Sequence, residues 1–79
     1  MFTHTIPNEL GPKLKFLRLL KGKSARGVAR ELKVSPMLIL KWESGESNPK
    51  VNKLASLAKA YDVSLDDLMK GSIIIKMEC

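Results

Sequence analysis

The stretch Ser35–Glu43, SPMLILKWE, decides how this chain folds. Its serine can cap a helix, and the proline that follows suits the first helical position. A glycine at position 45 favours a stop soon afterwards. Ile39 and Trp42 are three residues apart, so they share one face of that helix. The stretch therefore predicts a short helix that begins at Pro36, ends near Ser44–Gly45, and is held to a core by Ile39 and Trp42.

The other face of this helix is unusually apolar. At about 100° per residue, Met37, Leu40 and Lys41 point away from the core, and Pro36 lies at the edge. Leu38 lies about 70° from the inward direction, so we expect it to be partly buried. The helix thus presents two large apolar side chains and one cation to the outside.

A second short helix precedes the first. Ser24 can cap a helix over about 24–32 that faces inward with Val28, Ala29 and Leu32. Lys33–Val34 leaves room for only a tight turn before Ser35. Two short helices joined by such a turn are a helix-turn-helix, and the small Ala29 stands where the two helices must touch.

The remaining segments complete a helical body. Gly11–Pro12 opens a helix with proline at its first position, Leu14, Leu17 and Leu20 facing inward, and Gly22 at its end. A helix over about 50–61 and a fifth one over Leu65–Met69, opened by the capping box Ser64-x-x-Asp67, follow the decisive stretch. The expected inward face of the helix over 50–61 consists of Val51, Leu54, Leu57, Ala58 and Tyr61.

Both ends of the chain contain residues that favour strands. Phe2–Ile6 alternates apolar and polar types, and Ser72–Met77 contains three consecutive isoleucines. For 79 residues we expect one domain, with an arm over 1–10, a core over 11–70, and a tail or strand over 71–79. The fold class is all-α with five helices, and short terminal strands are an open alternative to flexible ends.

Charge is distributed unevenly along the chain. Residues 1–61 contain 12 basic and four acidic residues, whereas residues 62–79 contain two basic and four acidic ones. A basic body suggests a polyanionic partner. The exposed cations that we expect in this body are Lys13, Lys15, Lys21, Lys23, Arg26, Arg30, Lys33, Lys41, Lys50, Lys53 and Lys59.

Several classes of function are excluded or disfavoured. One histidine, His4, and one cysteine, Cys79, cannot build a metal site, so neither metal nor cofactor is expected. The sequence contains no paired carboxylates on an inward face, no nucleophile with a base at a recognisable spacing and no glycine-rich phosphate loop, so an enzyme is not expected. No apolar run approaches the ~20 residues needed to span a membrane. We expect a cytoplasmic protein.

From Leu14 to Met69 the sequence resembles the Cro/repressor-type (Xre-like) helix-turn-helix domains. The resemblance is carried by Arg18, Val28-Ala29, Val34-Ser35, Ile39 with Trp42-Glu43, Gly45, Asn48-Pro49 and the segment from Ala60 to Leu65. It implies a five-helix DNA-binding domain that acts as a dimeric transcription regulator. It also implies an ion pair between Arg18 and Glu43, which arginine and carboxylate can form bidentately.

Three features depart from the family pattern, and the third is the apolar stretch Ser35–Glu43. The family usually has Gln where this chain has Ala25, and Gly where it has Lys33. If Lys33 keeps the left-handed backbone of the usual glycine, it costs of order 1 kcal/mol.

Three readings of the apolar outward face remain open. In the first, the helix over 36–43 enters the major groove, Met37 and Leu40 touch thymine methyl groups, and the bases are contacted by Ser35, Pro36, Met37, Leu40 and Lys41. Phosphates are then contacted by Lys23, Arg26, Lys33, Asn48 and Lys50. In the second, Met37, Leu38 and Leu40 bind a protein, as in an antitoxin or adaptor. In the third, these side chains are merely tolerated at the surface.

The terminal segments suggest self-association. Phe2–Ile6 and Ile73–Met77 can pair with each other, with their counterparts in a second subunit, or with both. The expected partners are therefore double-stranded DNA and a second copy of the chain, with an intrachain pairing of the two ends in a monomer as the alternative.

Overall fold

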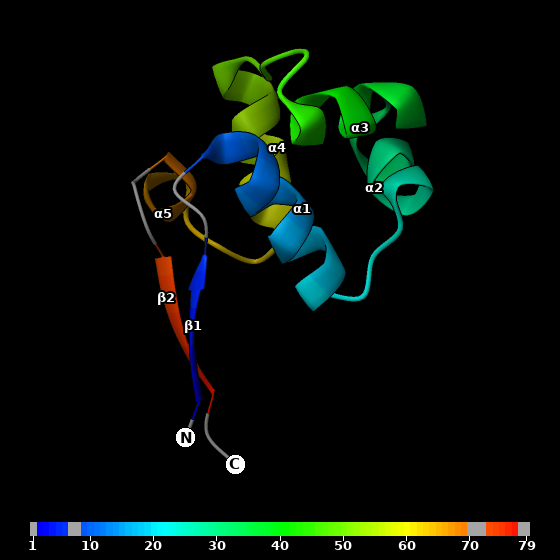
Figure 1. The fold of residues 1–79 in the computed structure, drawn as a ribbon. Coiled ribbons are helices and arrows are strands. Elements are labelled where there is room, and N and C mark those ends of the chain that lie inside the picture. The colour runs from blue at the N-terminus through cyan, green and yellow to red at the C-terminus, as the bar shows by residue number, and fades with distance from the viewer. Residues whose placement is uncertain (1, 7–8, 70–72, 78–79) are drawn as a thin grey trace.

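The computed structural model describes residues 2–6, 9–69 and 73–77. Residues 9–69 form a helical body, and the two terminal segments form a pair of strands (Figure 1). In chain order the elements are β1 (Phe2–Ile6), α1 (Leu10–Leu20), α2 (Ala25–Leu32), α3 (Pro36–Ser44), α4 (Val51–Ala60), α5 (Leu65–Met69) and β2 (Ile73–Met77). The five expected helices are confirmed, and the terminal segments, for which the sequence left strands and flexible ends open, are strands.

The core of the body is aliphatic, with one tryptophan and one tyrosine. α1 lies in the middle, with α2 and α3 to one side and α5 to the other (Figure 1). The buried apolar side chains are Leu14, Leu17, Val28, Ala29, Leu32, Ile39, Trp42, Leu54, Leu57, Ala58, Tyr61 and Leu68. Truncation of one such large side chain typically costs roughly 2–5 kcal/mol of unfolding free energy, so the position of α3 depends on Ile39 and Trp42.

Three corners of the body are built in the same way. After α1, α2 and α4 the chain passes through one left-handed residue, Gly22, Lys33 or Asp62, with φ between 56° and 69°. The next residue donates its N–H to a carbonyl five positions back, at 2.9–3.0 Å. A serine then caps the following helix by accepting from the N–H three residues on, at 2.9–3.2 Å. At each corner, three residues thus provide hydrogen-bond partners for backbone groups at the end of one helix and at the start of the next.

The two strands form an antiparallel ribbon. Phe2 pairs with Met77, His4 with Ile75 and Ile6 with Ile73. The ribbon extends away from the helices, and both ends of the chain lie at its far end (Figure 1). The pairing of the two terminal segments within one chain, which the sequence left as the alternative to pairing between two copies, is therefore present in the structure.

Four sequence-based expectations are wrong. Val51 is 64% exposed, because it is the first residue of α4 and lies beyond the reach of the core. Leu20, the last residue of α1, is 39% exposed. Pro12 occupies the third position of α1, because the helix begins two residues earlier at Leu10. Lys13, expected on the basic surface, is buried between α1 and α5, where its Nζ donates to the carbonyl of Leu68 at 3.0 Å.

Candidate nucleic-acid interface

α2, its corner and α3 form the expected helix-turn-helix. Lys33 adopts φ 60° and ψ 44°, and the Val34 N–H donates to the Ala29 carbonyl at 3.0 Å. Ala29 is buried at the contact between the two helices, where a larger side chain would separate them. The left-handed conformation that the family usually assigns to glycine is therefore kept here by a lysine.

The start of α3 is held by its own cap. The Oγ of Ser35 accepts from the N–H of Leu38 at 3.2 Å, and Pro36 is the first helical residue. Because the oxygen of Ser35 is used in capping, its hydroxyl proton is the group left to donate outward. Ser35 and Pro36 are both exposed, so the first turn of α3 is accessible from outside.

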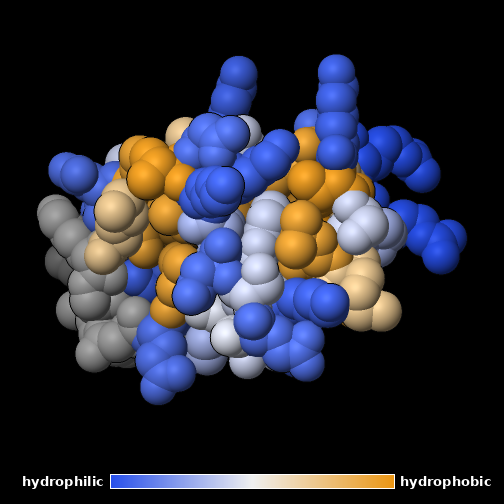
Figure 2. All heavy atoms as spheres, turned by 90° about the horizontal axis from the view of Figure 1, so that it is seen from above, coloured by the Kyte–Doolittle hydropathy of each residue, from blue (hydrophilic) through white to orange (hydrophobic). Residues whose placement is uncertain are grey.

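The two faces of α3 differ as the sequence predicts. Ile39 and Trp42 are buried and Leu38 is half-buried, whereas Met37 is 60% and Leu40 46% exposed. Seen from above, hydrophobic groups on this side of the molecule are separated by long hydrophilic side chains (Figure 2). The outward face of α3 therefore has exposed Met37 and Leu40 together with one exposed cation, Lys41.

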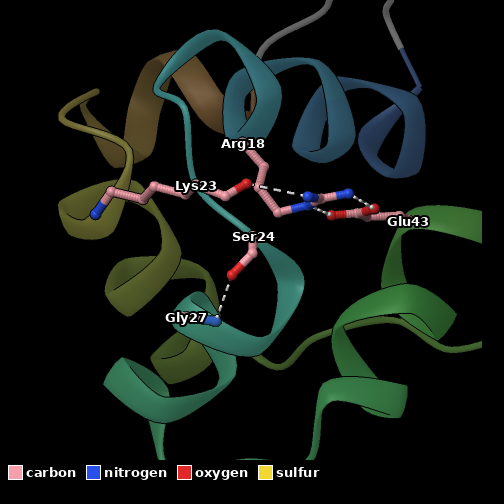
Figure 3. Close-up of polar contacts among 5 residues, drawn as sticks. All are labelled: Arg18, Lys23, Ser24, Gly27 and Glu43. Carbon is pink, nitrogen blue, oxygen red and sulfur yellow. Dashed lines mark hydrogen bonds and ion pairs between the residues drawn. The ribbon is translucent and has the colours of Figure 1, made fainter.

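The C-terminal end of α3 is tied to α1 by a bidentate ion pair. The Nε of Arg18 donates to Oε2 of Glu43 at 2.7 Å, and its Nη2 donates to Oε1 at 3.1 Å (Figure 3). The hydrogen bond that Arg18 donates to Glu43 is the largest cause that raises the pKa of Arg18 above its ordinary value. The Nη1 of Arg18 also donates to the carbonyl of Lys23 at 3.1 Å, so one guanidinium joins α1, α3 and the corner before α2.

A glycine brings α1 and α3 into close approach. A Cβ at Gly11 would lie 2.5 Å from the carbonyl oxygen of Glu43 and 3.0 Å from that of Trp42. No other residue type can occupy this position without moving one of the two helices. The position of α3 is thus determined at its inner face by side-chain packing and at its end by Gly11 and Arg18.

Four of the five residues that the sequence assigned to phosphate contacts are exposed. Arg26 lies in the first turn of α2, and Lys33 lies at the corner before α3. Asn48 precedes the buried Pro49 in the loop after α3, and Lys50 is the N-terminal cap residue of α4. These groups lie at the ends of the elements that border α3.

Lys23 is the exception. Its Nζ pairs with Oε1 of Glu31 at 3.1 Å, and its side chain extends away from Glu43 and α3 (Figure 3). It lines a hollow of about 460 Å³ with Glu31, Leu32, Ser56, Lys59 and Ala60. Lys23 is therefore set apart from the cations around α3.

Lys15 is a candidate that the sequence analysis did not single out. It is exposed on α1 and lines a hollow of about 220 Å³ with Arg18, Leu40, Glu43 and Ser44, directly beside the outward face of α3. Lys15 stands three residues before Arg18 and so shares its helical face. Because the family resemblance already implied that Arg18 meets α3, this spacing could have identified Lys15.

Within residues 2–6, 9–69 and 73–77, no three His, Cys, Asp or Glu residues gather as metal ligands would. Among these same residues, no helix has the length and apolar character needed to cross a membrane.

Comparison with known proteins agrees with this geometry. The helix-turn-helix family matches residues 14–68. Over 69 residues, which are 87% of this chain, the sequence is 35% identical to a protein named HTH-type transcriptional activator BcrR from Enterococcus faecalis. The chain spans about a third of that relative's length, 34%. The chain belongs to the helix-turn-helix family of the Cro/repressor (Xre-like) type, whose members are DNA-binding domains of transcription regulators.

Proposed function

We propose that this chain binds double-stranded DNA sequence-specifically and regulates transcription, with α3 in the major groove. The observation that carries the proposal is the exposed outward face of α3 in a helix-turn-helix, together with exposed Arg26, Lys33, Asn48 and Lys50 on the segments just before and after α3. An α-helix fits the major groove, and cations around it supply most of the non-specific affinity by neutralising phosphates. In this proposal the protein binds genomic DNA, which it would meet in the cytoplasm, the location expected from the sequence.

In this proposal the base contacts divide into two chemical classes. Ser35 and Lys41 donate hydrogen bonds, and Lys41 reaches guanine O6 and N7 or a phosphate. Pro36, Met37 and Leu40 make apolar contacts, and the apolar group that the major groove displays is the thymine methyl. Few bidentate contacts are available, so sequence-dependent DNA shape contributes a large part of the specificity.

The phosphate contacts follow from the exposed groups around α3. Arg26, Lys33 and Lys50 supply cations, and Asn48 with the N–H groups that open α4 supplies neutral donors. Lys15 joins this set because it lies beside Leu40. Lys23 is left out, because its Nζ pairs with Glu31 and its side chain extends away from α3.

One observation favours a second function. The exposure of Met37 and Leu40 suits a protein-binding surface, as in an antitoxin or adaptor that uses Met37, Leu38 and Leu40. DNA remains the preferred partner, since a surface that binds only protein has no need for the surrounding cations.

Single substitutions on α3 separate the two functions. We expect Met37→Ala and Leu40→Ala each to weaken binding to the preferred duplex by about 1 kcal/mol, with non-specific binding nearly unchanged. Lys41→Ala should weaken binding to every duplex if Lys41 contacts a phosphate, or relax one base position if it reads guanine. The measurement is fluorescence anisotropy on a duplex selected from a random pool and on a scrambled duplex.

Two controls make this experiment specific. Leu19→Ala removes an exposed leucine of α1 and should change neither affinity. Uracil in place of the contacted thymine should weaken the wild type but not the variant that has lost the contact. If Met37→Ala and Leu40→Ala keep the operator affinity and instead lose a cellular protein partner, the DNA-reading role of this face is wrong.

A further inference from the structure

The larger of the two hollows described above lies between α2, α4 and the corner after α1. Its lining consists of Lys23, Glu31, Leu32, Ser56, Lys59 and Ala60. Its volume of about 460 Å³ falls within the roughly 300–1,000 Å³ of small-molecule pockets. None of these residues lies on α3, and both lysines are cations that the proposed DNA interface does not use. The hollow is therefore a second candidate site, separate from the DNA-reading helix.

Two ammonium groups of the lining can donate hydrogen bonds to a ligand. Lys59 is exposed in the last turn of α4, and its Nζ has no hydrogen bond or ion pair with another residue of the described part of the chain. The Nζ of Lys23 donates to Glu31 at 3.1 Å, but an ammonium carries three protons, so further donors remain. Lysine is a common phosphate ligand, so the two groups together are suited to an anion with several oxygens.

Two oxygen-bearing side chains of the lining can accept hydrogen bonds. Glu31 uses Oε1 for Lys23, and 48% of its side chain is exposed, so Oε2 is left to accept. The hydroxyl of Ser56 donates to the carbonyl of Asn52 at 3.2 Å, so its oxygen is left as an acceptor. An anion without donors would leave both acceptors unmatched, whereas hydroxyl groups can donate to them. The lining therefore matches a molecule that has a phosphate and hydroxyl groups together.

We infer that this hollow binds a small hydroxylated phosphate ester, the chemical class of the sugar phosphates. The phosphate contacts Lys23 and Lys59, and hydroxyl groups of the same molecule donate to Glu31 and Ser56. The lysines outnumber the carboxylate in the lining, and a phosphate ester carries a charge of about −1.5 to −2 at pH 7, so the ligand is attracted to the hollow.

The hollow also borders groups that position α3. The carbonyl of Lys23 accepts from Nη1 of Arg18 at 3.1 Å, and Arg18 binds Glu43 near the end of α3 (Figure 3). A phosphate that competes with Glu31 for the ammonium of Lys23 acts on a residue whose backbone Arg18 also holds. This step rests on the proposed function: the sugar phosphate weakens DNA binding, and by linkage DNA weakens binding of the sugar phosphate.

Amide nuclear magnetic resonance of the isotope-labelled full chain without DNA tests the site. The probes are glucose 6-phosphate, glucose and inorganic phosphate, each added up to about 10 mM at constant ionic strength. We expect glucose 6-phosphate to shift the amide signals of Lys23, Glu31 and Lys59 in a saturable way. Glucose and inorganic phosphate each lack one set of contacts, so they should bind at least about tenfold more weakly.

Two lysines provide matched variants for this titration. Lys59→Met and Lys21→Met each remove one exposed cation and keep an unbranched side chain, but only Lys59 lines the hollow. Lys59→Met should weaken binding of glucose 6-phosphate about tenfold, and Lys21→Met should change it by less than about twofold. Equal effects of the two variants, or equal binding of glucose 6-phosphate and inorganic phosphate, overturn the site, because the anion then responds only to net charge.

A DNA arm separates this inference from the proposed function. In fluorescence anisotropy at constant ionic strength, glucose 6-phosphate should weaken DNA binding by wild type and Lys21→Met but not by Lys59→Met, and inorganic phosphate should affect none of them. Ligand binding by a chain that binds no DNA leaves the site in place and removes the proposed function. DNA binding without saturable amide shifts overturns the site, and an unchanged DNA affinity of the ligand-bound chain overturns its coupling to α3.

Discussion

Among single residues, Arg18 is one of the buried charged groups of the helical body. Its guanidinium donates to both oxygens of Glu43 and to the carbonyl of Lys23. Removal of one member of such a buried pair typically costs about 3–5 kcal/mol, since the other charge is left without a partner. The electrostatic influence of Arg18 and Glu43 extends to Tyr61, which is fully buried.

Tyr61→Phe is expected to stabilise the protein. The Tyr61 hydroxyl has no hydrogen-bond partner among the described residues, and a buried unsatisfied polar group costs about 1–3 kcal/mol. Burial, followed by the charge of Glu43, raises the pKa of Tyr61 above its ordinary 10.0. The hydroxyl therefore ionises more easily in the unfolded chain, and the stability of the wild type should fall as the pH rises above 10.0.

Urea denaturation of wild type and Tyr61→Phe at pH 7 and pH 11 measures both effects. The variant should be more stable at pH 7, and its advantage should grow at pH 11. Taking the difference between the two proteins cancels the contribution of Lys13, whose pKa is lowered chiefly by burial, against the attraction of Asp67. A less stable variant at pH 7 would mean that the hydroxyl has a partner, such as a buried water molecule.

At the scale of elements, the corner between α2 and α3 has a strained backbone at Lys33, a residue that we propose contacts DNA. Gly22, Lys33 and Asp62 occupy equivalent left-handed positions, but only Gly22 does so without a Cβ. Asp tolerates this conformation better than Lys, because its short polar side chain can hydrogen-bond locally. Lys33 therefore keeps a strained backbone next to the proposed DNA-reading helix, where its charge is useful.

Lys33→Gly should raise the free energy of unfolding by about 0.5–1 kcal/mol while weakening DNA binding. The matched variant Lys33→Ala removes the same charge but keeps the Cβ and its strain, so it should weaken DNA binding equally without the gain in stability. Thermal denaturation and anisotropy titration of the two variants measure the two effects separately. An equal stability of Lys33→Gly and Lys33→Ala would show that the corner is not strained.

Across the whole molecule, some cations are used in contacts within the protein and others are exposed to a partner. Lys13 ties α1 to the end of α5, and Lys23 pairs with Glu31. Arg26, Lys33, Lys41 and Lys50 are exposed on or beside α3. The net charge alone therefore overestimates the number of cations that DNA can meet.

The salt dependence of DNA binding should distinguish these groups. The logarithm of the binding constant should fall linearly with the logarithm of the salt concentration, with a slope of about −0.9 per phosphate neutralised. Lys50→Ala should reduce the magnitude of the slope by about 0.9. Lys59→Ala, which removes an exposed cation from the last turn of α4, should leave it unchanged. Equal slopes for the two variants would contradict the proposed orientation on DNA.

The amino-acid sequence by itself determined the local elements of this protein. Ser24, Ser35 and Ser64 cap helices as their spacing predicts, because a cap depends only on residues within the same turn. The two faces of α3 follow from its periodicity, since burial along a helix repeats with the helical period. The family resemblance implied the pair of Arg18 and Glu43, and the structure has these two residues in contact.

Only the tertiary structure decided which residues at the ends of elements are buried and which cations are free. Val51 and Leu20 follow the periodicity of their helices but are exposed, because the core ends before the helices do. Lys13 looks like a surface cation, yet it is buried, and its Nζ donates a hydrogen bond to the carbonyl of Leu68 in α5, 55 residues further along the chain. The register of β1 and β2 depends on two segments at opposite ends of the chain. Contacts between distant segments depend on how all elements pack together, and no local pattern encodes that packing.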